Sequence, residues 1–311
     1  MARGFSHRPV LLDEALEGLA IQADGFYVDG TFGRGGHAGA ILMELGPEGR
    51  LLAMDRDPEA VRSATEQFGN DPRFEIEQGA FTMLGALIEQ QQMNGQVNGL
   101  LLDLGVSSPQ LDDASRGFSF SEDGPLDMRM DPATGISAAQ WLAEAGEREI
   151  ADVLWTYGEE RYARRIARAI VAARDSAALD TTRRLAELIA AAVPGRERSR
   201  HPATRSFQAI RIYINCELDE LSGVLEQVPE MLAPQGRLAV ISFHSLEDRL
   251  VKRFIRREHR GEQPPAAFPL AGMDHKPRLR PVGGAIRANA AEVQHNPRAR
   301  SAVLRVAERL Q

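Results

Sequence analysis

The feature that most constrains the fold is an alternation of short apolar runs and helix-like segments through the first third of the chain. Several of the apolar runs end on an acidic residue, and they are apolar enough to be strands buried on both faces, as in a parallel sheet. Their alternation with helices over short connections predicts an α/β fold with right-handed crossovers. The expected strands are residues 26–29, 50–55, 74–76 and 100–103, and the expected helices are 37–45, a segment capped by Asp57, and 81–92.

The alternation then stops and returns only in the last third of the chain. Residues 106–136 are polar and rich in Gly, Asp, Ser and Pro, and they are too numerous for an idle connection inside a compact domain. A mostly helical block follows them. We therefore expect one discontinuous sheet domain, residues 1–109 and 216–311, interrupted by a mostly helical insertion at 110–215.

In the last third we expect a helix that ends at Leu232 and a strand at residues 237–243. Ser245 and Asp248 are the expected caps of the helix after that strand, because short polar side chains accept hydrogen bonds from the first N–H groups of a helix. Residues 302–307 are expected to form the last strand, at an edge of the sheet.

Composition places the chain among globular proteins. Hydrophobic residues make up 43% of the 311 residues and charged residues 26%, which excludes a disordered chain. No apolar run approaches the roughly eighteen residues that a membrane span needs. Because Cys216 is the one cysteine, neither an intrachain disulfide nor a zinc site of paired cysteines is expected. We expect a cytoplasmic protein with no metal and no membrane partner.

Charge is divided unevenly along the chain. The net charge is −7, yet residues 150–311 hold 27 Lys and Arg against 19 Asp and Glu. Arginine pairs with phosphates and stacks on bases, so this basic half has the composition of an RNA-facing surface, with ordinary solvated helix faces as the alternative. The clearest basic face has helical spacing and consists of Arg161, Arg164, Arg165 and Arg168.

A glycine-rich loop follows the first expected strand. Gly33-x-Gly35-x-x-Ala38 matches half of a dinucleotide-binding fingerprint, and Asp55 lies about twenty residues further on, where a ribose-binding acid belongs. Adenosine is shared by NAD and S-adenosylmethionine, so the loop fits either cofactor. Asp55 could instead cap the next helix, although Asp57 already suits that role.

The fourth expected strand ends on Asp103 and is followed by the turn Ser107-Ser108-Pro109. Ligands of open α/β sheets bind at the carboxyl ends of the strands. In amino-group methyltransferases a short polar-Pro motif at this place accepts hydrogen bonds from the target amine, and Ser108-Pro109 resembles a divergent form of it. The alternative for Asp103 is that it caps the next turn.

Eight stretches together resemble the MraW-type small-subunit ribosomal RNA cytosine-N4 methyltransferases of bacteria. They occur in order over nearly the whole chain and are specific as a set, although residues 261–290 match no motif. The stretches are residues 29–37 (Asp-Gly-Thr-Phe-Gly-Arg-Gly-Gly-His), 103–112, 116–120, 124–131 (Gly-Pro-Leu-Asp-Met-Arg-Met-Asp), 157–161, 206–211, 241–248 (Ile-Ser-Phe-His-Ser-Leu-Glu-Asp) and 296–301.

The resemblance implies a class I, Rossmann-like S-adenosylmethionine-dependent methyltransferase with a helical insertion domain for substrate recognition. The implied substrate is the exocyclic N4 of a cytidine in 16S ribosomal RNA, and the implied partners are the small ribosomal subunit and its RNA. The cofactor contacts carried over are Gly35, Gly36, His37, Asp55, Phe81, Asp103 and Gln110.

The groups expected to act on the amine come from the same strand ends. Asp103, or the turn Ser107-Ser108-Pro109, would accept hydrogen bonds from N4. His244 follows the fifth strand and is expected either to contact substrate or to be a hydrogen-bonded structural histidine. The arginine face at residues 161–168 would grip RNA. Two other functions are considered: a nucleotide-dependent oxidoreductase, which only the glycine loop and Asp55 suggest, and a non-catalytic RNA-binding factor.

Overall fold

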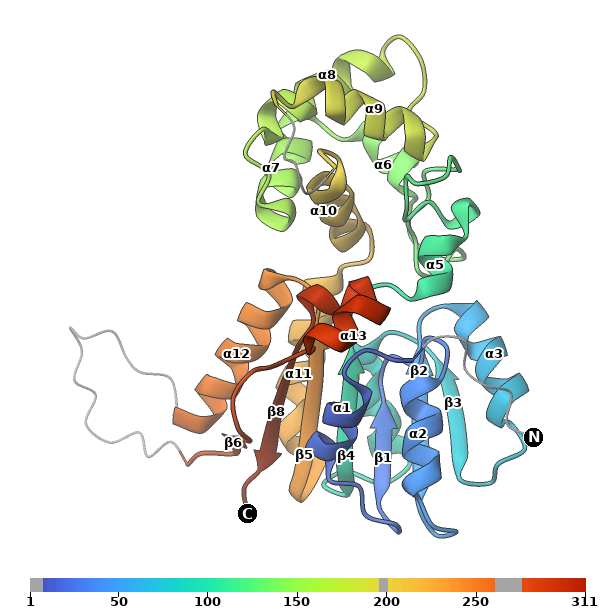
Figure 1. The fold of residues 1–311 in the computed structure, drawn as a ribbon, viewed down its shortest axis with the longest axis vertical. Helices are drawn as coiled ribbons and strands as arrows, with labels where there is room; N and C mark the ends of the chain where they lie inside the picture. The colour runs from blue at the N-terminus through green and yellow to red at the C-terminus, as the bar shows by residue number, and fades with distance from the viewer. Residues whose placement is uncertain (1–7, 196–200, 261–275) are drawn as a thin grey trace, which may run out of the picture. The chain divides into compact units, whose positions relative to one another are not determined.

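The computed structural model describes residues 8–195, 201–260 and 276–311. Within it the chain divides into two compact units (Figure 1). The first unit comprises Met1–Gly105 and Leu218–Gln311, and the second comprises Val106–Glu217.

The first unit is an α/β sheet domain. Its strands are β1 (Phe26–Asp29), β2 (Arg50–Asp55), β3 (Phe74–Gln78), β4 (Val97–Asp103), β5 (Leu232–Ser242), β6 (Leu279–Pro281), β7 (Ile286–Arg287) and β8 (Val303–Arg309). Its helices are α1 (Leu12–Leu19), α2 (Gly36–Glu44), α3 (Pro58–Phe68), η1 (Phe81–Met83), α4 (Leu84–Gln90), α11 (Glu217–Met231), α12 (Ser245–Arg260), α13 (Ala290–His295) and η3 (Pro297–Ser301).

The sheet has the order β3-β2-β1-β4-β5-β8-β6, with β7 also paired to β8. Strands β1 to β5 are parallel, and β8 is antiparallel to β5 and to β6. The expected mostly parallel, Rossmann-like fold is confirmed. The expectation of an edge strand near residue 302 is wrong, because β8 lies inside the sheet. Its residues Leu304, Val306 and Ala307 are buried on both faces, which is typical of an interior strand.

Alternate residues of each strand point to opposite faces of the sheet and fill two separate cores. On one face Leu100 and Leu102 pack with residues of α4, α11 and α12, including Leu225. On the other face Leu101 packs with α1, α2 and α3, where Ile41 is fully buried. The result is a three-layer domain with helices on both faces of the sheet (Figure 1).

Two helix starts in this unit show which polar side chains act as caps. Asp57 caps α3 as expected, because its carboxylate accepts from the Glu59 N–H at 2.9 Å. The caps expected for α12 are wrong. Ser245 is the first helical residue, and the carboxylate of Glu247 instead accepts from the N–H groups of Phe243 and His244 at 2.8 and 3.2 Å. Asp248 pairs with an arginine of β8.

The second unit is helical and has its own hydrophobic core, in which Leu154, Ile166, Ile170, Leu185 and Ile210 are fully buried. The helices of the second unit are α5 (Ser108–Asp112), η2 (Ala114–Arg116), α6 (Ala138–Glu144), α7 (Glu147–Gly158), α8 (Ala163–Arg174), α9 (Thr182–Ala192) and α10 (Thr204–Ile214).

No helix among the described residues of either unit has the length and apolar character that crossing a bilayer requires.

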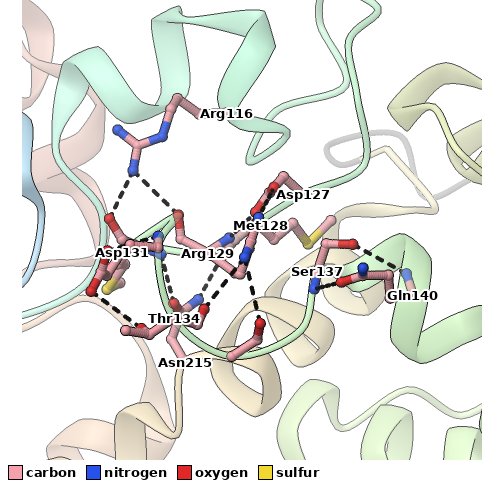
Figure 2. Close-up of polar contacts among 12 residues, drawn as sticks. Arg116, Asp127, Met128, Arg129, Asp131, Thr134, Ser137, Gln140 and Asn215 are labelled. Atoms are coloured by element: carbon pink, nitrogen blue, oxygen red, sulfur yellow. Dashed lines mark hydrogen bonds and ion pairs between the residues drawn. The ribbon is translucent and has the colours of Figure 1, made fainter.

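The polar stretch before α6 is held by a network of side-chain hydrogen bonds (Figure 2). Buried Asn215 accepts from the Met130 N–H at 2.8 Å and donates to the Met128 carbonyl at 2.7 Å. The Arg116 guanidinium donates to the Met130 carbonyl at 2.9 Å, and Ser137 and Gln140 form the capping box of α6. These bonds satisfy the backbone of a segment that has little regular structure of its own.

Candidate active site

The glycine-rich loop connects β1 to α2 and requires glycine for the protein's own packing. Gly33 and Gly35 have φ values of 57° and 75°, in the left-handed region that favours glycine. A Cβ on Gly35 would lie 2.5 Å from the Phe32 ring, and a Cβ on Gly36 would lie 2.3 Å from Pro9. Larger residues would therefore displace the loop even in the absence of a ligand.

Asp55 ends β2 and is joined to the glycine loop. Its carboxylate accepts from the Gly33 N–H at 2.7 Å and from the Asp57 N–H at 2.8 Å. Each oxygen of a carboxylate can accept a further hydrogen bond, so both retain acceptor capacity. Burial raises the pKa of Asp55 to about 6, against the lowering effect of the N–H groups of Asp57, Gly33 and Arg56. The capping role belongs to Asp57, so the acceptor capacity that Asp55 retains is not used to cap α3.

Asp103 ends β4 and lies against His37 from the first turn of α2. The Asp103 Oδ2 atom is 3.5 Å from His37 Nδ1, and the Asp103 N–H donates to the Thr31 hydroxyl at 2.6 Å. Burial raises the pKa of Asp103 well above its usual value, and the charges of Asp29 and Glu247 raise it further. Burial lowers the pKa of His37 to about 4, so this imidazole is neutral at physiological pH.

Asp29, at the end of β1, is the most deeply buried acid of this edge. It is 1% exposed, and burial raises its pKa to about 7. Asp29 Oδ2 and Asp103 Oδ1 have no hydrogen-bond partner among the described residues. Buried polar atoms in proteins are nearly always paired, so two carboxylate oxygens without a partner at one sheet edge indicate the place of a ligand.

His244 follows β5, whose end is bonded to the same edge through the Leu104 N–H and the Ile241 carbonyl at 2.9 Å. His244 Nε2 lies 3.1 Å from Glu247 Oε1, and its Nδ1 accepts from the Glu247 N–H at 3.4 Å. Glu247 is 2% exposed. These contacts hold His244 at the start of α12, yet its Nε2 is a buried atom without a hydrogen-bond partner among the described residues, so both roles expected for His244 stay open.

Phe81 begins η1 directly after β3 and is half-buried against the core that α4 and α11 share. The neighbouring Thr82 hydroxyl donates to Glu220 Oε2 at 2.7 Å. This tie to α11 holds the loop after β3 in place, so the ring of Phe81 keeps a defined position at the carboxyl end of the sheet.

The remaining expected site residues belong to the second unit. Ser107 is the N-cap of α5, and the Gln110 side chain accepts from the Ser107 N–H at 2.9 Å. Gln110 is 6% exposed and completes a capping box, a structural role that the sequence analysis missed. Ser108 and Pro109 form the first turn of α5. The basic residues Arg161, Arg164, Arg165 and Arg168 are all exposed at the start of α8 or just before it.

Asp29, Thr31 and Glu247 are the site residues to which the sequence analysis assigned no role. Asp29 could have been found, because an acidic residue ends β1 just as Asp55 ends β2 and Asp103 ends β4. Thr31 and Glu247 carry no such signal, since their positions depend on the meeting of separate segments.

Comparisons with known proteins show the family. The family model described as MraW methylase family matches residues 4–310. The chain belongs to the MraW methylase family. A ribosomal RNA small subunit methyltransferase H from Thioalkalivibrio sulfidiphilus is 62% identical over 98% of this chain and 98% of that protein. The protein of the same name from Shewanella amazonensis is 56% identical over 100% of this chain and 99% of its own length.

The chain is also similar to solved structures. An rRNA methylase from Streptococcus thermophilus matches with a TM-score of 0.44 and 12% identity over 99% of this chain and 100% of that one. The sheet order found here, with one antiparallel strand between β5 and β6, is that of class I methyltransferases. Fold and family together identify S-adenosylmethionine as the cofactor.

The described residues fit this cofactor chemically. Methylases of this family bind a ligand that carries a sulfonium cation, an ammonium group and two ribose hydroxyls. Asp29 and Asp103 each offer a buried carboxylate oxygen without a partner, which suits a cationic ligand, and Asp55 retains acceptor positions for hydroxyls. A nearby cation also favours the ionised form of a carboxylate, which offsets the raised pKa values of these groups.

Proposed function

We propose that this protein methylates ribosomal RNA of the small subunit and that its target is the exocyclic N4 of a cytidine. The names of its relatives, at 56–62% identity over nearly their whole length, support the ribosomal RNA substrate. The motifs described above support the finer choice of cytosine N4. The single observation that carries the mechanism is the partner-free Asp103 Oδ1 at the carboxyl end of β4.

The difficulty of the reaction lies in the nucleophile. The N4 lone pair is delocalised into the cytosine ring, so N4 attacks only when it is held in line and its developing positive charge is stabilised. The bound cofactor supplies an activated methyl group on its sulfonium. The protein must hold the amine about 3–3.5 Å from the reacting carbon and accept hydrogen bonds from its protons.

Asp103 is suited to accept one of those hydrogen bonds. Its N–H is fixed by the Thr31 hydroxyl and its Oδ2 lies beside neutral His37, while Oδ1 has no partner in the described part of the chain. An ionised Asp103 also compensates the positive charge that grows on N4. The turn Ser107-Ser108-Pro109 lies four residues further along the chain and is the second candidate for an acceptor.

The helical unit is the proposed RNA-recognition part, with the small ribosomal subunit as partner. The arginines at 161, 164, 165 and 168 are exposed at one end of α8, and Arg168 has only a 3.6 Å contact with Glu147. Exposed arginines neutralise the phosphates of a bound RNA, and a protein that holds a structured RNA contacts its phosphates. A cytidine in a helix or stack must also be splayed out before N4 can be reached. The family assignment replaces the oxidoreductase alternative.

Mass-spectrometric mapping of ribosomal RNA from cells with and without the gene tests this proposal. We expect one cytidine of the small-subunit RNA to lose a methyl group on N4 when the gene is deleted, and to regain it with the wild-type gene. A gene that encodes Asp103→Ala serves as the matched control and should not restore it. An unchanged pattern of cytidine methylation after deletion, or a change confined to another base, contradicts the proposal.

A further inference from the structure

A groove between α11 and α12 of the first unit is lined by arginines that the methyl-transfer site does not use. The groove has a volume of about 410 Å³. Arg249, Arg253 and Arg257 follow one another at intervals of one helical turn and line its α12 side. Its floor is apolar and includes Leu225 and Leu250.

One acidic residue of α12, Glu258, contacts the groove arginine Arg257 at 3.1 Å. Glu247 accepts from the backbone at the start of the helix, as described above. Asp248 pairs with Arg305 at 2.7 Å, and Glu258, which is 2% exposed, pairs with Arg278 at 2.7 Å. The outer surface of α12 is therefore cationic. The remaining basic residues of that surface are Lys252, Arg256 and Arg260, all exposed.

The three arginines of the groove differ in how firmly they are held. Arg257 pairs with Glu226 across the groove at 2.6 Å and lies over the Phe254 ring at 5.4 Å, so it forms a fixed wall. Arg253 is exposed and has no acidic partner in the part of the chain that the structure describes. Arg249 is also exposed. Arg253 is therefore the groove arginine whose charge is open to an anionic ligand, and Arg249 lies exposed one helical turn away.

We propose that this groove binds a single-stranded segment of the RNA substrate. Phosphates would lie on Arg249 and Arg253, and a base or ribose would lie against the apolar floor. Proteins that bind single strands combine a cationic groove with surfaces that accept bases in this way. The volume is that of a small-ligand pocket, which admits a splayed nucleotide rather than a duplex. The identity of the ligand as RNA rests on the proposed function.

The test compares two double variants of the full-length protein. Arg249→Gln with Arg253→Gln removes the two exposed charges of the groove. Arg50→Gln with Arg62→Gln removes two exposed arginines elsewhere in the same unit, with side chains 50% and 72% exposed. The probes are an in-vitro transcript of small-subunit ribosomal RNA and a single-stranded oligouridine, and binding is measured by filter retention over a series of KCl concentrations.

We expect the groove variant to bind both probes roughly tenfold more weakly, with the slope of log affinity against log salt reduced by about 1.5, as for two lost phosphate contacts. The Arg50/Arg62 variant should match the wild type. Equal affinity and equal slope for the groove variant would overturn the proposal, as would a duplex RNA that competes as well as the single strand. Filter retention measures RNA binding and requires no methyl transfer. If the wild-type protein binds RNA through this groove but modifies no cytidine in cells, the proposed function is wrong and the groove proposal still stands.

Discussion

Acidic residues with shifted pKa values have opposite surroundings in the two units. At the carboxyl edge of the sheet, Asp29 and Asp103 each have an oxygen without a partner, and burial raises the pKa of both. In the loop of the helical unit, burial would raise the pKa of Asp127, but hydrogen bonds from the side chain and backbone of Arg129 lower it (Figure 2). The second arrangement is self-sufficient, and the first is complete only with a ligand.

This difference predicts which substitutions affect activity and which affect stability. A paired carboxylate such as Asp127 stabilises the fold that contains it. A buried carboxylate without a cation destabilises the free protein and is retained only where a ligand compensates it. Substitutions at the sheet edge should therefore reduce activity, and substitutions in the loop should reduce stability.

The largest expected effect is on activity, from Asp103→Ala. Loss of the acceptor for the N4 protons should reduce the rate of methyl transfer about 10³-fold, while the free energy of unfolding stays the same or rises. Methylation assays on unmodified small subunits and denaturant unfolding measure the two quantities. Asp103→Asn should retain more activity, because an amide accepts a hydrogen bond but cannot compensate the charge. A rate within a few-fold of wild type would place the centre of the reaction elsewhere.

The converse test is Asn215→Ala in the helical unit. It leaves the Met130 N–H and the Met128 carbonyl without their partner in a buried place, so unfolding free energy should fall by about 3 kcal/mol. Affinity for S-adenosylmethionine should not change. Denaturant unfolding and calorimetry measure these, with exposed Asn94→Ala as the control. Loss of cofactor affinity in a folded Asn215→Ala protein would contradict the separation of roles.

The pH dependence of stability should have opposite signs in the two regions. The folded pKa of Asp29 is raised from 3.8 to about 7, so the folded state binds more protons than the unfolded state and loses stability as pH rises through this window. Asp29→Asn should therefore be more stable than wild type at pH 8, by about 4 kcal/mol, with the gain absent below about pH 4.

Asp127→Asn should have the opposite pH dependence from Asp29→Asn. The folded pKa of Asp127 is lowered, so its stabilising effect is present above the unfolded pKa and is lost as pH falls through the folded one. The variant should be less stable than wild type at pH 8 and equal to it in acid. Thermal unfolding of both variants in the absence of cofactor at several pH values decides the question, and shifts of the same sign in both would break the comparison.

A smaller effect is expected from Asp55→Ala. Loss of charged hydrogen bonds to ribose should weaken S-adenosylmethionine binding by about 2 kcal/mol in calorimetry. The control is Asp57→Ala, which removes the N-cap of α3 without removing a ligand contact and should lower stability only. Unchanged cofactor affinity in a folded Asp55→Ala protein would exclude the ribose assignment.

The smallest expected effect concerns surface charge in the helical unit. Arg161, Arg164 and Arg165, each replaced by glutamine, should weaken binding of small subunits several-fold and flatten its salt dependence. Cofactor affinity should stay as in wild type. Filter retention at several salt concentrations distinguishes this RNA-binding face from a merely solvated helix face, for which neither affinity nor salt slope would change.

The sequence alone determined the α/β class and the strands that carry the expected site residues. Apolar runs that end on an acidic residue identified β1, β2 and β4. Strands buried on both faces are apolar along their length, and polar residues follow at their carboxyl ends, where ligands bind. The pattern Asp57-Pro58-Glu59 identified the start of α3, since capping depends on neighbours in the chain. The family was recognisable from motifs because such motifs are local.

Only the tertiary structure decided which side chains meet. β8 is an interior strand because β6 returns to pair with it, a contact that no local pattern encodes. Gln110 was expected near the cofactor, and that expectation stays a prediction; the structure adds that its side chain accepts from the Ser107 N–H in the cap of α5. The tertiary structure also decided that Asp29 and Asp103 each have a carboxylate oxygen without a partner among the described residues. Whether a buried carboxylate has a partner depends on every segment packed around it, and those segments come from distant parts of the chain.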